Sequence, residues 1–288
     1  MSADHDGLTR RQKLRLRGHF GFTKAPFSKY MWATKMYDSS SQRDLLAGLQ
    51  MWLELKGITL VTGPSGVGKS ITLRRFVKEL DEARYHVVAP TTLPSTPHGC
   101  LRSLSRELGL PMRQHTADLF DQVRGRLVEL GKAEGPHPIL VLDDAEGLRA
   151  PVMDVLRRLT ASDLDEQDHF SMVLAGTDEL LHTLQVTSLA PLRSRIGFTW
   201  QLRPYGLEDA RQYVAYQLQR ANVDAKVFSD HAVKRIFQAS RGYPRSINQL
   251  ALQALIQAAI AGIDTIDGDF MQRVCKSHPL YQGVQGAA

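Results

Sequence analysis

Up to about residue 204, the hydrophobic positions of the chain follow two kinds of pattern. Short apolar runs rich in β-branched residues predict buried strands, and stretches with an apolar residue every three or four positions predict amphipathic helices. Strands are expected at 58–61, 85–89, 138–142, 170–175 and 196–202, and helices at 43–55, 69–80, 99–108 and 116–130. Strands that alternate with helices predict an α/β fold: a five-stranded parallel sheet flanked by helices.

The pattern changes after Pro204. The segments that follow all have helical spacing, at 207–221, 229–239, 245–261 and 267–276. They predict a small all-helical domain over 205–288. We expect the α/β domain over 20–204, with the aromatic-rich stretch before residue 41 packed onto a domain surface. Residues 1–19 are expected to form a flexible arm, with basic side chains at Arg10, Arg11, Lys13, Arg15 and Arg17.

Charge narrows the class of partner. The formal net charge is +6 and the sequence pI is about 9.4, which favours a polyanionic partner. Two interpretations of the basic arm stay open. It is either a solvated tail, or an arm that lies along a nucleic-acid backbone or an acidic protein face.

Cysteine content and hydropathy bear on the compartment. Cys100 and Cys275 lie far apart and form no CxxC pair, which indicates packed or free thiols in a reducing compartment. No apolar run approaches the roughly 18–20 residues that span a bilayer, and no apolar core follows the basic N-terminus. We therefore expect a cytoplasmic protein with no membrane partner.

A glycine-rich loop between the first expected strand and the next helix carries the strongest chemical signal. It matches the pattern GxxxxGK[ST] with Gly63, Pro64, Ser65, Gly66, Val67, Gly68, Lys69 and Ser70, and Ile71 follows. Glycines let backbone N–H groups turn toward phosphate oxygens, the lysine reaches the outer phosphates, and the serine hydroxyl ligates magnesium. We therefore predict that residues 63–71 bind ATP with Mg²⁺.

A carboxylate at the end of a neighbouring buried strand should hold this magnesium ion through water. Asp143 and Asp144 follow the apolar run 139–142, and we assign Asp143, together with Ser70, to the metal. Asp144 stands where the base that orients the attacking water usually stands, a position more often held by Glu. Because the Asp side chain is shorter, hydrolysis is expected to be slow, and Glu146 is a possible substitute base.

Three further positions are candidates for contacts with the γ-phosphate. Thr177 follows the fourth strand and is assigned a sensing role, with a simple strand-ending turn as the alternative. Arg193 and Arg195 precede the fifth strand, where an arginine acts on the nucleotide of a neighbouring subunit or pairs within its own subunit. Arg245 begins a helix of the second domain, where its charge opposes the helix dipole, so a phosphate nearby would explain it.

Together these residues resemble the ExeA/TniB/TnsC-like group of AAA+ ATPases. The likeness runs from residue 20 to about residue 277, and its most specific stretch, Ser240-Arg-Gly-Tyr-Pro-Arg-Ser-Ile-Asn248, is similar to the group's GxPRxIN signature. The segments 20–27, 202–208 and 228–232 are also similar to signatures of the group. The resemblance implies a P-loop AAA+ domain followed by a helical lid, with Thr177 as sensor 1, Arg245 as sensor 2 and Arg193 or Arg195 as the arginine finger. The group usually has Asp-Glu where this chain has Asp143-Asp144.

The resemblance also implies partners. The transposon-encoded branch assembles with ATP on double-stranded DNA, as homo-oligomeric rings or helical filaments, and recruits or activates a transposase, in some cases with a target-selection protein. We expect this function, with DNA contacts at the basic arm and at Thr92, Thr96, Arg102, Arg106 and Arg113. The alternative is an ExeA-like secretion or signalling accessory ATPase that acts on a protein partner without DNA. A third hypothesis is a nucleotide-binding scaffold without useful turnover.

Overall fold

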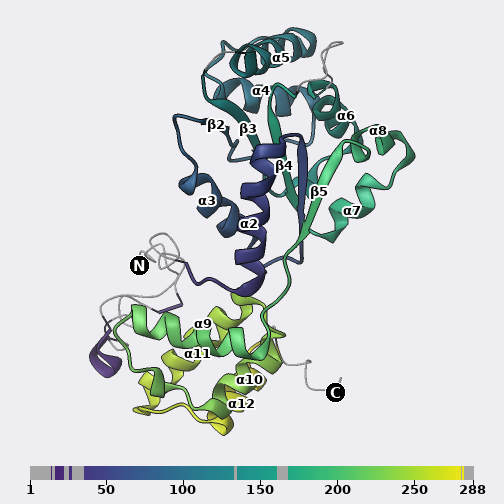
Figure 1. The fold of residues 1–288 in the computed structure, drawn as a ribbon. Coiled ribbons are helices and arrows are strands. Elements are labelled where there is room, and N and C mark those ends of the chain that lie inside the picture. The colour runs from purple at the N-terminus through teal and green to yellow at the C-terminus, as the bar shows by residue number, and fades with distance from the viewer. Residues whose placement is uncertain are drawn as a thin grey trace. The chain divides into compact units, whose positions relative to one another are not determined.

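A computed structural model describes residues 14, 17–22, 26–27, 36–132, 135–160, 168–279 and 281. The chain divides into two compact units. One consists of residues 41–203, and the other combines residues 1–40 with residues 204–288. Figure 1 labels most of their helices and strands.

Residues 41–203 contain one parallel sheet with the strand order β2-β3-β4-β1-β5. The strands are β1 (Ile58–Thr62), β2 (Tyr85–Val88), β3 (His137–Leu142), β4 (Ser171–Gly176) and β5 (Ile196–Gln201). Each lies within a residue or two of the position that the apolar runs predict. The predicted α/β fold with a five-stranded parallel sheet is therefore confirmed.

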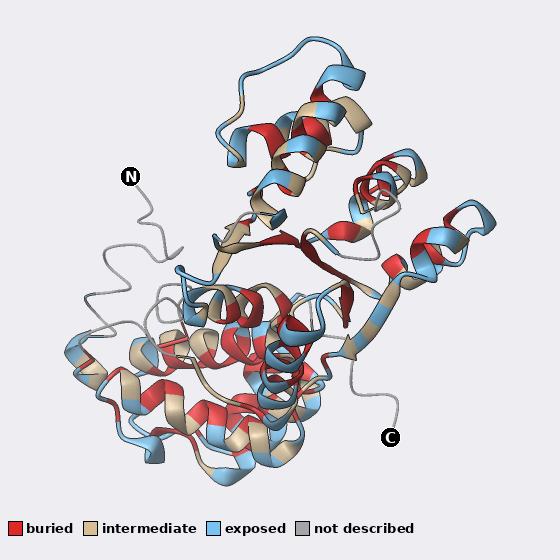
Figure 2. Ribbon diagram, turned by 45° about the horizontal axis from the view of Figure 1, so that its top comes forward, coloured by how far each residue is buried: buried red, intermediate tan, exposed pale blue. Residues whose placement is uncertain are grey.

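The strands β1, β3 and β4 are buried on both faces, and alternate residues of each strand enter two separate hydrophobic cores. On β3, Leu140 and Leu142 pack into one core, and Ile139 and Val141 pack into the other. Figure 2 shows the resulting continuous burial along the central strands. Because successive side chains of a strand point to opposite faces, a strand covered on both sides is mainly apolar.

The helices of this unit divide between the two cores. The core that contains Ile139 also contains the buried side chains of α2 (Ser40–Leu55) and α3 (Lys69–Glu79). The other contains buried side chains of α4 (Pro97–Glu107), α5 (Thr116–Lys132), α6 (Ala150–Leu159), α7 (Asp178–Leu184) and α8 (Ala190–Arg193). Short 3₁₀ turns, η2 (Ala145–Gly147) and η3 (Thr187–Leu189), join these elements. The helices α6, α7 and α8 were not among those predicted from the apolar spacing.

The second unit has its own core, formed by α9 (Leu207–Arg220), α10 (Asp230–Ser240), α11 (Pro244–Ala261) and α12 (Gly268–Ser277), with η4 (Ala225–Val227). Phe22 and Phe27 of the aromatic stretch are 3% and 4% exposed within this core. The described part of that stretch therefore packs with the helical unit. No described helix has the length and apolar character needed to cross a bilayer.

Candidate nucleotide-binding site

The glycine-rich loop and the predicted acidic residues lie at one edge of the sheet. β4 has β1 on one side and β3 on the other, and the last register pair of β1 and β4 joins Thr62 to Gly176. Because all three strands are parallel, the loop after β1, Asp143 after β3 and Thr177 after β4 follow their carboxyl ends. The carboxyl edge of an open α/β sheet is the usual place for a ligand.

The loop has a backbone that its glycines make possible. Gly63, Gly66 and Gly68 have φ angles of 149°, 82° and 113°, which side chains rarely adopt. Gly68 is also the N-cap of α3 and supplies no capping side chain. The first N–H groups of α3 are therefore available to an anion, as they are where a helix N-terminus binds phosphate.

Lys69 is buried at the start of α3 and turns back onto the loop. Its ammonium donates to the carbonyl oxygens of Gly63 at 2.7 Å and of Pro64 at 3.3 Å. Burial lowers the pKa of Lys69, and the carboxylates of Glu146, Asp143, Asp144 and Asp178 act in the opposite direction. The lysine charge therefore interacts favourably with several acids, as expected where a magnesium–phosphate complex binds.

Two residues that the sequence motif did not indicate, Gln42 and Thr72, form hydrogen bonds that hold the backbone of the loop. The buried Gln42 amide donates to the Thr72 hydroxyl at 3.2 Å, and that hydroxyl donates to the carbonyl oxygen of Gly68 at 2.9 Å. Thr72 lies next to the motif in the sequence, one turn into α3. Gln42 comes from α2, before the first strand, and the periodicity of that helix gave no sign of contact with the loop.

The two aspartates after β3 differ in exposure and conformation. Asp143 is half-buried, and its Oδ1 accepts a hydrogen bond of 3.0 Å from the backbone N–H of Asp144. Asp144 is exposed and adopts the left-handed conformation, with φ 55° and ψ 37°. A non-glycine residue in that conformation is uncommon, and such residues concentrate at functional sites.

Glu146 and Thr177 meet at the end of β4. The backbone N–H of Thr177 donates to Oε2 of Glu146 at 3.2 Å. The Thr177 hydroxyl oxygen is buried and has no hydrogen-bond partner in the described part of the chain. Because a buried hydroxyl without a partner is costly, this atom is one that a ligand would satisfy.

These groups fit a magnesium-bound triphosphate. Phosphate oxygens accept hydrogen bonds, and the site offers the α3 N-terminus, the Lys69 ammonium and the Thr177 hydroxyl as donors. Magnesium prefers oxygen ligands and is usually held by one or two carboxylates or hydroxyls together with substrate phosphates. Ser70 and Asp143 supply oxygens of this kind.

The two arginines before β5 are held within their own subunit. Arg193 donates to the carbonyl oxygen of Leu184 at the end of α7, at 3.0 Å. Arg195 donates to the Arg157 carbonyl oxygen at 3.3 Å and to the Thr160 hydroxyl at 3.1 Å. Both residues are exposed, and each guanidinium has further N–H groups beyond these bonds. Arg245 is exposed in the first turn of α11, directly after Pro244.

The predicted DNA contacts have mixed surroundings. Arg10, Arg11, Lys13 and Arg15 lie outside the described residues, and Arg17 is exposed. Thr92, Arg102, Arg106 and Arg113 are exposed, and Arg113 donates to Gln122 Oε1 at 3.4 Å. Thr96 is exposed but caps α4, because its hydroxyl oxygen accepts a hydrogen bond from the Gly99 N–H.

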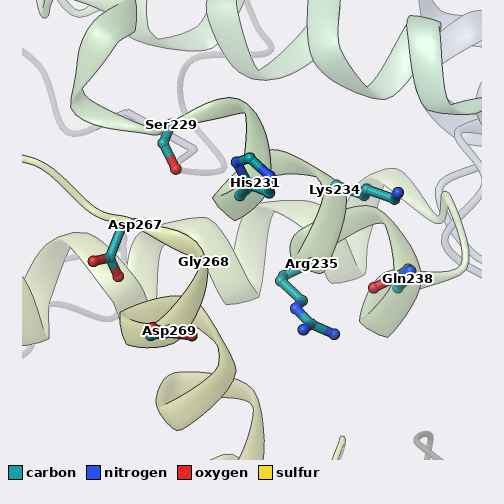
Figure 3. A pocket seen from close by; sticks show the side chains of 8 residues that line it. All are labelled: Ser229, His231, Lys234, Arg235, Gln238, Asp267, Gly268 and Asp269. Carbon is teal, nitrogen blue, oxygen red and sulfur yellow. The ribbon is translucent and has the colours of Figure 1, made fainter.

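A separate cavity of about 550 Å³ lies in the helical unit, between α10 and the start of α12. Figure 3 shows its lining residues, Ser229, His231, Lys234, Arg235, Gln238, Asp267, Gly268 and Asp269. Two of them cap helices: Ser229 accepts a hydrogen bond from Ala232 N–H, and Asp267 accepts one from Phe270 N–H. No predicted nucleotide-binding residue lines this cavity.

Residues 53–184 match the family described as "AAA domain". These residues form an AAA domain. The chain is also 30% identical over 247 residues to General secretion pathway protein A of Aeromonas hydrophila. That alignment covers 84% of this chain and 45% of the relative, so the chain spans about half the length of the protein that it matches.

Solved structures share the fold at low sequence identity. The ORC2 protein of Aeropyrum pernix has a TM-score of 0.65 at 14% identity, over 86% of this chain and 71% of that one. Cdc6p of Pyrobaculum aerophilum has a TM-score of 0.58 at 20% identity, over 86% of this chain and 70% of that one. The sequence match therefore supports the AAA domain, and the structural likeness supports its fold.

Proposed function

We propose that this chain is a magnesium-dependent ATPase that uses its AAA domain to bind and hydrolyse ATP. The observation that carries the proposal is the arrangement at the carboxyl edge of the sheet. The buried Lys69 ammonium donates within the loop, and the carboxylates of Asp143 and Glu146 oppose the lowering of its pKa. The Thr177 hydroxyl, next to the backbone N–H that Glu146 accepts from, is buried without a partner among the described residues. In this proposal residues 63–71 hold the phosphates, and Ser70 and Asp143 hold magnesium.

Turnover and binding measured on the same variants test this proposal. Lys69→Ala removes the cation of the loop, so we expect loss of ATP affinity. Asp143→Asn removes the metal-side charge, so we expect a loss of turnover that is larger than the loss of affinity. Glu129→Gln, at an exposed residue of α5, is the control for removal of an acid. A wild-type chain that shows no magnesium-dependent ATP binding would overturn the proposal.

For the cellular role, we propose that the chain is an accessory ATPase that acts on a protein partner. The similarity to General secretion pathway protein A over 84% of this chain supports this proposal. ATP binding would then drive self-association, with Arg193 or Arg195 reaching the nucleotide of a neighbouring copy. We expect oligomers that form with a non-hydrolysable ATP analogue in the absence of DNA. Mass photometry at matched protein concentrations, with and without duplex DNA, measures this directly.

The second candidate is a DNA-bound regulator of transposition that recruits or activates a transposase. Two observations favour it: the net charge of +6, and the exposed Arg102 and Arg106, one turn apart on α4. Neither arginine has an ion-pair partner among the described residues. Contacts of this kind would go to the phosphate backbone and would not depend on sequence.

Fluorescence anisotropy with a labelled duplex separates the two outputs. The DNA candidate requires binding that is stimulated by ATP, weakened by salt and reduced in Arg102→Ala/Arg106→Ala. Lys234→Ala/Arg235→Ala, in the cavity of Figure 3, removes the same charge elsewhere and is the matched control. Equal loss in both variants would indicate a general charge effect. Oligomers that form with ATP and ignore DNA would favour the protein-partner output.

A further inference from the structure

Glu146 is the carboxylate that lies over the end of β4. Its Oε2 accepts the hydrogen bond from Thr177 N–H at 3.2 Å, and the same oxygen lies 2.8 Å from where a Cβ on Gly176 would stand. The absence of a side chain at residue 176 therefore leaves the space that this carboxylate uses. Glu146 is half-buried there, next to the strand end that carries the Thr177 hydroxyl.

The turn after β3 accounts for this placement. The chain reverses at Asp144, in the left-handed conformation, and then forms the short 3₁₀ turn η2. The N–H groups of Gly147 and Leu148 bond back to the carbonyl oxygens of Asp144 and Ala145, at 3.3 and 3.1 Å. This turn returns Glu146 to the neighbouring strand, while Asp144 stays at the surface.

Asp144 and Glu146 differ in whether hydrogen bonds fix the direction of the carboxylate. The Asp144 carboxylate is exposed and makes no hydrogen bond to any described residue, so nothing fixes its direction. Glu146 has one oxygen fixed by a backbone N–H, and its other oxygen makes no hydrogen bond to any described residue.

We propose that Glu146, and not Asp144, is the catalytic base of this site; the proposal rests on the proposed ATPase function. The water oxygen attacks the γ-phosphorus, and one water proton passes to Oε1 of Glu146. The bond from the γ-phosphorus to the β–γ bridging oxygen breaks, and its electron pair leaves with ADP. Inorganic phosphate is the second product, and Glu146 releases its proton to solvent.

Glu146→Gln tests this role without removing the structural bond. The glutamine carbonyl oxygen can still accept the hydrogen bond from Thr177, but the amide cannot take a proton from water. Loss of a general base typically costs about 10²–10⁴-fold in rate, so we expect turnover to fall about 100-fold or more. Affinity for a fluorescent ATP analogue and thermal stabilisation by magnesium-ATP should persist. The bound nucleotide recovered after incubation should be ATP in the variant and ADP in the wild type.

The comparison variants are Asp144→Asn and Glu179→Gln, the latter at an exposed acid in the first turn of α7. We expect the fall in ATP turnover in Asp144→Asn to be at least about tenfold smaller than the fall in Glu146→Gln. Glu179→Gln should match the wild type. Glu146→Asp keeps the charge on a shorter side chain and should fall between the wild type and Glu146→Gln.

Two results would overturn the assignment and leave the ATPase function standing. One is a wild-type chain that hydrolyses ATP while Asp144→Asn binds ATP and does not. The other is a Glu146→Gln variant whose turnover and bound nucleotide match the wild type. By contrast, a wild-type chain that binds no ATP would overturn the proposed function itself.

Discussion

A Cβ atom on Gly48 of α2 would lie 2.3 Å from Cη2 and Cζ2 of the Trp200 indole on β5. The Trp200 ring therefore occupies the space beside the helix that every other amino acid would need. Glycine in a helix interior is less stable than alanine by about 0.5–1 kcal/mol. At Gly48 this loss accompanies close packing of the helix against the Trp200 ring.

Gly48→Ala should destabilise the protein despite the better helix propensity of alanine. Forcing a methyl group into a packed site costs roughly 1–3 kcal/mol, which outweighs the propensity gain. Gly125→Ala in α5 is the matched control, because a Cβ there meets nothing within 4 Å. It should stabilise by about 0.5–1 kcal/mol. Urea unfolding measures both, and shifts of the same sign in the two variants would contradict the packing argument.

The sheet and most helices were predictable because their apolar spacing records burial directly. Ile139, Leu140, Val141 and Leu142 are all buried, so a continuous apolar run was a sufficient signal. The phosphate loop was also predictable, because its chemistry needs a fixed local pattern. Contacts between distant segments were not. The sequence around Gly48 gives no sign of a contact with Trp200, which lies on β5, the last strand of the sheet in the sequence.

The positions of the Asp144 and Glu146 side chains could not be predicted from the sequence either, although the two residues are only two apart. Sequence order suggested Asp144 as the base, because it directly follows Asp143, and left Glu146 as a possible substitute. The left-handed turn at Asp144 reverses the chain, and that turn depends on backbone angles that an Asp-Asp pair does not specify. Likewise, the aromatic stretch gave no indication of which core would bury Phe22 and Phe27.

Gly63→Ala should abolish tight nucleotide binding. The φ angle of Gly63 is 149°, and a Cβ there would lie 2.5 Å from the carbonyl oxygen of Leu202. That carbonyl belongs to a backbone that cannot easily move, because Leu202 N–H is bonded to Thr62 O at 2.9 Å. We expect ATP affinity to fall at least about tenfold, or about 1.4 kcal/mol. Titration with a fluorescent ATP analogue measures this.

The control for that variant is Gly197→Ala on the exposed side of β5, where a Cβ meets nothing within 4 Å. It should leave the dissociation constant as in the wild type. If Gly63→Ala bound ATP as tightly as Gly197→Ala, the glycine requirement of the loop would be refuted.

Thr177→Val should separate stability from catalysis. The Thr177 hydroxyl is buried without a partner in the described residues, so its removal relieves a desolvation cost of about 1–3 kcal/mol. We expect the nucleotide-free variant to be at least as stable as the wild type in urea. Its ATP turnover should fall by about tenfold or more if the hydroxyl contacts the γ-phosphate in the transition state. Unchanged turnover together with unchanged ATP affinity would show that the hydroxyl has no sensing role.

His137 should make the stability of the protein depend on pH in the mildly acidic range. Burial, with a smaller contribution from the positive charge of Lys56, lowers the pKa of His137 to about 4, while its ring bonds to Ser171 Oγ at 3.0 Å. The unfolded chain, with an ordinary histidine pKa near 6.5, takes up a proton as the pH falls below that value, and the folded protein does not until about pH 4. Protonation therefore favours the unfolded state, and the free energy of unfolding should decrease from pH 6.5 to pH 4. His137→Gln should flatten this slope in urea unfolding at pH 7.5, 6 and 5, while His182→Gln, at an exposed histidine, should keep it. An unchanged slope in His137→Gln would show that other groups account for the acid sensitivity.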